Sequence, residues 1–221
     1  YEVKQQGLPA NNSAFRFYKK SALIGLSEYR FEETTLTGAA GEIINTGTGG
    51  TNGTRINSPT TTLKVSATAN GKICRGVTVP SNATLAQKDA IDIGLSPASI
   101  GSTGTITFWY KSNSSWSLED NALFDATTTS GKWFYFAKMQ SGKLRFVVAD
   151  NASKTSVLTL APSTNLSVPA GTWKHLAVTW SLATSSGGST LQIYVDGVLY
   201  GSASGTTNGV LKSTLGTLYL G

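Results

Sequence analysis

The segment GTWKHLAVTW carries the only histidine of the chain, His175, between two of its five tryptophans, Trp173 and Trp180. A histidine can act as a general base or hold a metal ion, but a base needs a nucleophile or a carboxylate within hydrogen-bond reach. The sequence has no Gly-x-Ser-x-Gly elbow and no second histidine for a metal pair. In an extended strand, His175 and Trp173 share one face, and Leu176 lies on the other. We therefore predict a structural histidine.

Paired carboxylates are the other chemistry that the sequence could supply. Glycosidases use two carboxyl groups, which lie about 5 Å apart in retaining enzymes and farther apart in inverting ones. The nearest pair on one face of a strand is Glu28 and Glu32, and their separation along an extended chain is about 13 Å. A glycoside-acting enzyme is therefore an alternative rather than the main prediction.

Loop residues with hard oxygen atoms are the candidates for binding calcium. Asp120 and Asn121 lie in SLEDNALFD, Asp125 ends the same stretch, and Asp150 and Asn151 follow LRFVVA. The same residue types form Asx turns and loop caps without any ligand. We include all five in the candidate binding site. We expect no cofactor, with calcium held by Asp125 and Asp150 as the alternative.

Three aromatic residues complete the candidate binding site. Trp116 lies in the polar loop NSSWSLED, where an exposed indole could stack on a sugar or anchor a protein interface. The alternative for Trp116 is a lid over one end of the fold. Trp109 and Tyr194 alternate away from core positions on their strands, and with Gln192 they could line a platform for a glycan.

These candidates need β-structure to position them. Charged residues form 14% of the 221-residue chain, against about 25% in an average domain. Thr, Ser, Gly and Asn fill the difference, and these residues favour strands and turns over helix interiors. Alternation with a period of two recurs at 105–112, 132–139, 143–150, 173–180, 191–197 and 217–221. This pattern predicts an all-β fold of two packed antiparallel sheets.

Turns and linkers divide the chain. The pair Asp196-Gly197 between two alternating stretches predicts a type I′ hairpin. Residues 34–62 are rich in Gly, Thr and Asn, and we expect them to form a long loop. Residues 1–24 are expected to be a strand or linker from an upstream region, in which 14–20 could pair beside an edge strand. The domain itself is expected over 25–221.

Charge and cysteine content restrict the function classes. The formal net charge is +6, without the dense Lys/Arg stripe that nucleic-acid binding requires, so we predict no nucleic-acid partner. The balance suits weak attraction to anionic polymers or cell surfaces. Cys74 is the only cysteine, and we expect it to be buried as a small apolar residue. No apolar run approaches the roughly 20 residues of a membrane span.

Five segments follow one another in a distinctive order: SEYRFEE, NTGTGGTNGT, TITFWYKS, GTWKHLAVTW and LQIYVDGVLYGSA. This order resembles the laminin-G-like, concanavalin-A-like jelly-roll domain, over about residues 26–221. The combination of EYRFEE, AGEIINTG, KICRG and ITFWYKSN also resembles the domain of the MshQ family of MSHA-pilus biogenesis proteins. The resemblance implies an antiparallel two-sheet jelly-roll β-sandwich of the concanavalin A-like lectin/glucanase type.

The chain departs from the family pattern at several positions. Asn45 stands where the family has a loop aspartate, and Lys174 replaces the first of its usual two histidines. Glucanases of this fold carry their carboxylates on one strand as E-x-D-x-E, which this sequence lacks. The sequence stops at LYLG, where the family adds a further strand, and leaves open whether the domain keeps that strand.

Together the residues and the resemblance predict a non-catalytic recognition or adhesion module. Its expected partners are a glycan or a cell-surface protein ligand, and other domains of a larger surface protein. Its expected location is extracellular, on a bacterial cell surface and in pilus-associated machinery. The alternatives are a glycoside-acting enzyme of the same fold and a structural spacer between domains.

Overall fold

The computed structural model of the chain describes residues 2–4, 16–18, 26–57, 64–80, 89–128, 133–149, 157–182, 188–205 and 215–221. For 2–4, 16–18, 157 and 158 it describes the backbone alone. The described elements are strands, apart from a short 3-10 helix at Pro97–Ser99. The predicted all-β fold class is confirmed.

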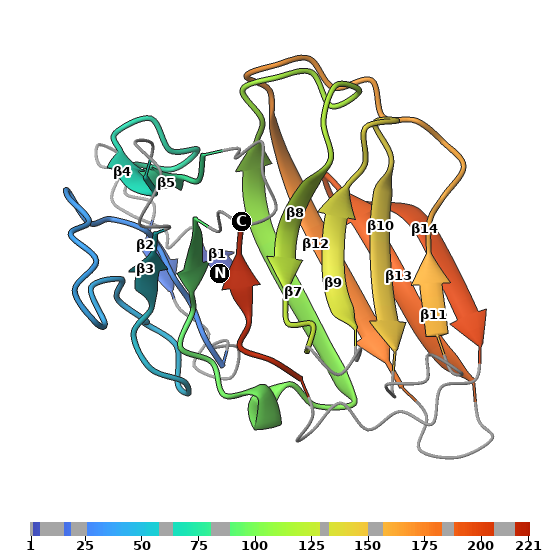
Figure 1. Cartoon of the computed structure of the whole chain (residues 1–221), viewed down its shortest axis with the longest axis horizontal. Coiled ribbons are helices and arrows are strands. Elements are labelled where there is room, and N and C mark those ends of the chain that lie inside the picture. The colour runs from blue at the N-terminus through green and yellow to red at the C-terminus, as the bar shows by residue number, and fades with distance from the viewer. Residues whose placement is uncertain are drawn as a thin grey trace.

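Two antiparallel sheets pack face to face, as Figure 1 shows. The seven-stranded sheet has the spatial order β11 (Val157–Leu160), β10 (Leu144–Ala149), β9 (Phe134–Lys138), β8 (Asn121–Asp125), β15 (Tyr219–Leu220), β6 (Ala90–Asp92) and β3 (Thr54–Ile56). The four-stranded sheet has the order β14 (Val198–Gly205), β13 (Ser189–Val195), β12 (Trp173–Ser181) and β7 (Thr103–Lys111). A separate hairpin joins β4 (Ser66–Thr68) to β5 (Gly76–Thr78).

Aromatic side chains from both sheets meet in the core. The ring of Phe134 lies 5.1 Å from that of Trp180, and the ring of Phe136 lies 6.2 Å from that of Phe108. Ring pairs at these distances are favourable beyond the area they bury. Gly104 lies opposite Trp180 on β7, where an added Cβ would come within 2.2 Å of the indole. The sequence therefore fills this core with rings and keeps a glycine where one ring needs the space.

The hairpin between β13 and β14 has the predicted turn. Asp196 has φ of 51° and Gly197 has φ of 80°. A type I′ turn requires positive φ at both central residues, which Asp-Gly accepts at low cost. The turn therefore sets the pairing of the two strands from its own local sequence.

Two sequence-based expectations are wrong. The expected loop at 34–62 contains β3, which pairs with β6 in the seven-stranded sheet. A three-residue strand is too short for its alternation to stand out in a Gly-rich stretch. Cys74 is exposed instead of buried. It lies with φ of 58° in the turn between β4 and β5.

The N-terminal region contains a strand, but not with the predicted partner. β2 (Arg16–Tyr18) pairs with β1 (Glu2–Lys4) in a two-stranded sheet, and not with an edge strand of the sandwich. The remaining residues of the predicted strand at 14–20 lie outside the described residues. Among the described residues, no helix has the length and apolar character needed to span a membrane.

Candidate binding face

The side of the four-stranded sheet that points away from the core is called the outer face below. Leu176, Val178 and Leu191 of this sheet are completely buried, and side chains alternate along a strand, so their neighbours point outward. The outer face contains Thr105, Thr107, Trp109 and Lys111 of β7, Trp173, His175, Ala177 and Thr179 of β12, and Gln192 and Tyr194 of β13. Hydroxyl, amide and aromatic groups therefore dominate it.

Trp109 is the most prominent aromatic residue of the outer face. It lies directly opposite His175 in the pairing of β7 with β12, and the two ring centres are 5.2 Å apart in an edge-on arrangement. Trp109 nevertheless remains 41% exposed. An indole that is held by a neighbour and still exposed can stack on an apolar ligand surface without first being ordered.

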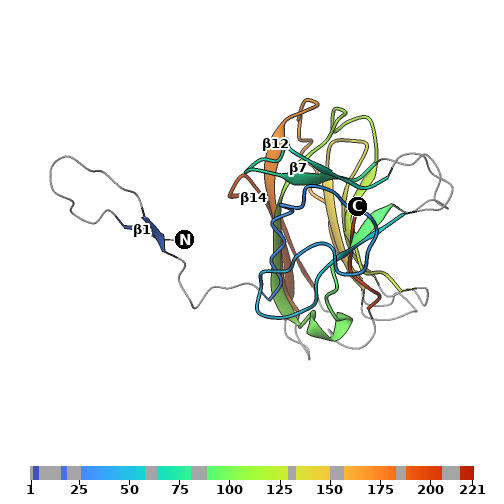
Figure 2. The same cartoon turned by 90° about the vertical axis from the view of Figure 1, so that its left-hand side faces the viewer.

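Two ammonium groups lie over indole rings at the same end of the outer face. Nζ of Lys111 is 4.9 Å from the centre of the Trp173 ring, and Nζ of Lys72 is 4.9 Å from the centre of the Trp109 ring. Lys72 comes from the turn between β4 and β5, a hairpin that lies across β7 in Figure 2. Both contacts have cation–π geometry.

His175 makes contacts of a structural kind. Its Nε2 is 2.7 Å from Oγ1 of Thr107, and its backbone N–H donates to Oδ1 of Asp196 at 2.9 Å. The other carboxylate oxygen of Asp196 accepts from Nζ of Lys174 at 2.6 Å, and this hydrogen bond lowers the pKa of Asp196. The ring thus contacts a hydroxyl and an indole ring, as expected for a histidine that positions its neighbours.

Replacing His175 with glutamine is expected to lower the free energy of unfolding by about 0.5–1.5 kcal/mol, the usual net contribution of one hydrogen bond. Urea unfolding followed by circular dichroism would measure the change. Thr107→Val should cause a similar loss, and the double variant should lose little more than either single one, because both changes remove the same contact. Fully additive losses would show that the contact contributes nothing.

Tyr194 and Gln192 form the second part of the outer face. The hydroxyl of Tyr194 donates to Oε1 of Gln192 at 3.1 Å, and Oγ1 of Thr179 donates to the same oxygen at 3.2 Å. Tyr194 and Trp109 thus lie on one face of one sheet, as their alternation predicted. Their role in binding stays a prediction.

A hollow of about 350 Å³ lies between the end of β11, the segment that follows it, and the middle of β14. Among the described residues that line it, Tyr200 is the only aromatic one, and its hydroxyl donates to the carbonyl of Thr164. None of these described lining residues is charged. The outer face is therefore the better candidate for a recognition site.

A family model, Laminin_G_3, described as the concanavalin A-like lectin/glucanases superfamily, matches residues 76–221. This range contains the whole four-stranded sheet and every strand of the seven-stranded sheet except β3. The chain belongs to the concanavalin A-like lectin/glucanases superfamily. No curated protein sequence matches it significantly.

Two solved structures of botulinum neurotoxin type G align with this concanavalin A-like domain, and only the first of them at a TM-score that indicates a similar fold. The binding domain of the toxin aligns with a TM-score of 0.50 and 11% identity over 84% of this chain and 42% of its own. A second structure, of the receptor binding domain, aligns with a TM-score of 0.39 and 11% identity over 84% of this chain and 45% of its own. The chain thus spans less than half of each of these structures, and the first likeness supports the fold alone.

Trp116 differs most from its sequence-based interpretation. Its exposed fraction is 0%, its ring lies 5.7 Å from that of Tyr110, and its backbone N–H donates to the carbonyl of Val168 at 3.2 Å. Its burial contradicts the exposed, sugar-stacking indole and fits the alternative of a lid over the end of the sandwich. The polar neighbours of Trp116 in sequence gave no sign that a distant loop would cover it.

Asp120 and Asn121 lie near a buried lysine. Lys138 of β9 is 0% exposed, and its Nζ donates to the carbonyls of Trp116, at 3.2 Å, and Glu119. Burial lowers the pKa of Lys138, while the charges of Glu119 and Asp120 act in the opposite direction. The ammonium group of Lys138 thus occupies the position beside these carbonyl oxygens that a bound calcium ion would need.

The other proposed calcium ligands do not form a cluster in the described structure. Oδ1 of Asp125 accepts the backbone N–H of Thr127 at 2.7 Å, which is an Asx turn. Asp150 and Asn151 lie outside the described residues. In the described part of the chain, no group of three or more His, Cys, Asp or Glu side chains could hold a metal. Calcium binding by Asp125 and Asp150 stays a prediction that calcium titration would test.

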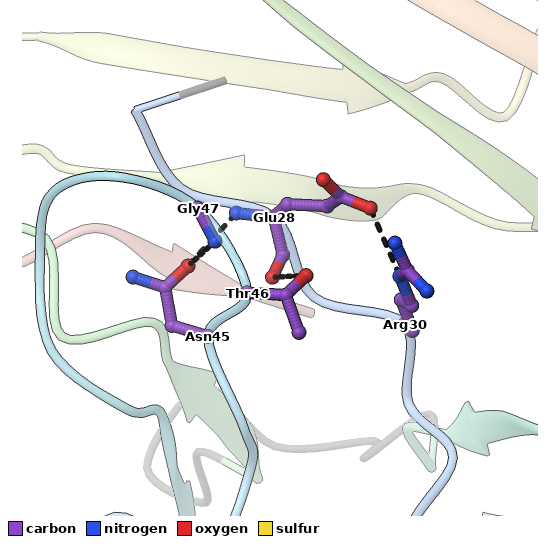
Figure 3. A network of polar contacts seen from close by, with 5 residues as sticks. All are labelled: Glu28, Arg30, Asn45, Thr46 and Gly47. Carbon is purple, nitrogen blue, oxygen red and sulfur yellow. Dashed lines mark hydrogen bonds and ion pairs between the residues drawn. The ribbon is translucent and has the colours of Figure 1, made fainter. Parts of the chain in front are cut away.

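The departure at Asn45 has a structural reason, and Figure 3 shows the part of it that involves Glu28 and Gly47. Oδ1 of Asn45 accepts the backbone N–H groups of Glu28, at 2.9 Å, and Gly47, at 2.8 Å, and its Nδ2 donates to the carbonyl of Gly49 at 2.6 Å. A carboxylate could accept both N–H groups but could not donate to Gly49. This loop is therefore held by an amide.

Glu28 and Glu32 do not form the carboxylate pair of a glycosidase. Oε1 of Glu28 accepts from Nε of Arg30 at 3.0 Å (Figure 3), and the side chain of Glu32 is exposed. Their segment forms only an isolated bridge, between Tyr29 and Asn45. The geometry of this pair does not support the hydrolase alternative.

Proposed function

We propose that this domain is a non-catalytic recognition module that binds a glycan through the outer face of its four-stranded sheet. The observation that carries the proposal is the 41%-exposed indole of Trp109, which His175 holds in place at the end of a polar face. Aromatic residues that are fixed in this way are the usual anchors of binding sites.

The chemistry of the outer face suits a sugar. A sugar ring offers an apolar C–H face, which an indole can stack against, and hydroxyl groups, which need donors and acceptors. Thr105 and Thr107 supply exposed hydroxyl groups beside Trp109. Gln192 and Tyr194 supply an amide and a phenol on the neighbouring strand. The face thus combines one stacking surface with polar groups of both kinds.

We further propose that the domain works outside a bacterial cell, as part of a larger surface protein. The support is the resemblance of EYRFEE, AGEIINTG, KICRG and ITFWYKSN to the MshQ family, which suggests pilus-associated machinery. In this proposal, residues 25–221 form the recognition domain and 1–24 join it to an upstream region. A protein ligand on a cell surface is the alternative to a glycan.

Trp109→Ala is expected to weaken glycan binding about 5- to 150-fold, because truncating an aromatic anchor costs about 1–3 kcal/mol. A glycan array, probed with and without calcium, would select the ligand, and calorimetry would compare the variants. Tyr219→Ala is the control, because Tyr219 is partly exposed but lies on the seven-stranded sheet. Equal affinity of Trp109→Ala and the wild type would remove Trp109 from the site.

The proposal also predicts that the purified protein releases no reducing ends from laminarin, agarose or carrageenan. The reason is that Glu28 and Glu32 lack the arrangement of a catalytic pair. A reducing-end assay would measure this directly. Steady release that disappears in Glu28→Gln or Glu32→Gln would instead identify an enzyme.

A further inference from the structure

We propose that the ligand of the outer face is an anionic glycan, one that carries sulfate or carboxylate groups. This inference rests on the proposed function and specifies its ligand class. It depends on the end of the outer face where β7 and β12 carry two tryptophans and their basic neighbours, called the basic aromatic block below: Trp109, Lys111, Trp173 and His175, with Lys72 above them.

The register of the strands builds this block. Trp109 lies opposite His175, and Trp173 lies opposite Lys111. The two tryptophans are thus diagonal neighbours on one face, and side chains in such positions lie within reach of one another. Each of the two tryptophans therefore has a basic side chain directly opposite it on the neighbouring strand.

Lys72 adds a cationic group from outside the sheet. Its ammonium and that of Lys111 each lie 4.9 Å from the centre of an indole ring, those of Trp109 and Trp173. A neutral sugar that stacked on the ring face beneath either ammonium would displace that ion and gain no charge interaction in return. A sugar with a sulfate or carboxylate could stack on the ring and pair with the displaced ammonium, because charged hydrogen bonds are the stronger kind.

Three of the acidic groups, those of Asp196, Asp120 and Glu119, interact with other partners. The carboxylate of Asp196 accepts from Lys174 and from the backbone of His175. The carboxylate of Asp120 accepts from the backbone of Gln140, and the charge of Glu119 acts on Lys138, both at the end of the seven-stranded sheet. In the described part of the structure, neither of the ion pairs joins a carboxylate to Lys72 or Lys111. The block is therefore free to attract an anion, in a chain of net charge +6.

Three polymers with the same backbone test the inference: dextran sulfate, carboxymethyl dextran and neutral dextran. Calorimetry at 50 mM and 300 mM NaCl would measure their affinity for the full chain. We expect at least one charged polymer to bind about 10-fold more tightly than dextran. Its affinity should fall at the higher salt concentration, because the screening length becomes shorter. The sulfated and carboxylated polymers show which anion is preferred.

Matched lysine variants locate the binding. Lys72→Gln and Lys111→Gln remove the charge and keep a polar side chain one bond shorter, and each is expected to weaken binding of the charged polymer about 3- to 10-fold. Lys143→Gln removes the same charge from the turn between β9 and β10 in the other sheet, and should change the affinity little. Equal losses in all three variants would show non-specific attraction and overturn the inference.

The same experiment separates this inference from the proposed function. Binding of neutral dextran that is lost in Trp109→Ala and unchanged in the lysine variants would overturn the anionic class and keep the glycan site. Binding of a charged polymer that survives Trp109→Ala would contradict the site itself. Failure of all three polymers and of the glycan array to bind would overturn both proposals.

Discussion

Replacing Phe146 with alanine is expected to lower the free energy of unfolding by about 3–5 kcal/mol, the range for truncating a buried aromatic ring. Phe146 is completely buried on β10. Its ring lies 5.5 Å from Phe134, 6.0 Å from Phe124 and 6.4 Å from Trp180. The change removes a ring that links the two sheets, and it leaves a cavity whose rigid aromatic walls cannot close around it.

Urea unfolding, followed by circular dichroism, would measure this loss. Leu118→Ala is the control, because Leu118 is 60% exposed and its truncation should change the stability by less than about 0.5 kcal/mol. A loss below about 1 kcal/mol in Phe146→Ala would contradict the aromatic core that joins the sheets.

Lys138→Met is expected to lower the free energy of unfolding by about 2–4 kcal/mol. The reason is that the buried carbonyl of Trp116 and the partly buried carbonyl of Glu119 lose their charged donor, and an unsatisfied buried acceptor costs about 1–3 kcal/mol. Relief from burying the ammonium ion offsets part of this loss. The loop that contains Trp116 should therefore open before the rest of the domain.

Hydrogen exchange would locate the effect of Lys138→Met at 112–121, and urea unfolding would give its size. Lys143→Met is the matched control, because Lys143 is only partly buried in a turn. Unchanged stability in Lys138→Met would show that its ammonium does not organise this loop. Restoration of the loop by calcium in the variant would show that a cation can replace the ammonium there.

The strands that the sequence predicted well are long and alternate without interruption. β7 and β12 each span nine residues, and their two faces differ strongly in apolar character, so that local pattern alone identifies them. Asp196-Gly197 also determines its turn locally. β3 could not be found in this way, because its three residues, which follow Gly53, gain their strand conformation from β6, which lies far away in the sequence.

The binding face could be predicted only in part. Alternation was enough to place Trp109 and Tyr194 on the same side of a sheet. The contact of His175 with Thr107 depends on the register of two strands 68 positions apart, and no local pattern encodes that register. Trp116 shows the opposite error, because its polar neighbours suggested exposure while Val168 and Tyr110 bury it. Lys72 reaches Trp109 only because the β4–β5 hairpin folds over β7.

The most direct test of the binding face uses the five indole N–H signals of the protein as reporters in a ¹H–¹⁵N NMR titration. Trp109 and Trp173 lie on the outer face, Trp116 and Trp180 are buried, and Trp133 lies beside Tyr135 of the other sheet. Titration with the glycan selected on the array should shift the signals of Trp109 and Trp173 and leave the other three in place. Shifts confined to Trp133, or no shift at Trp109 at saturation, would contradict binding at the outer face.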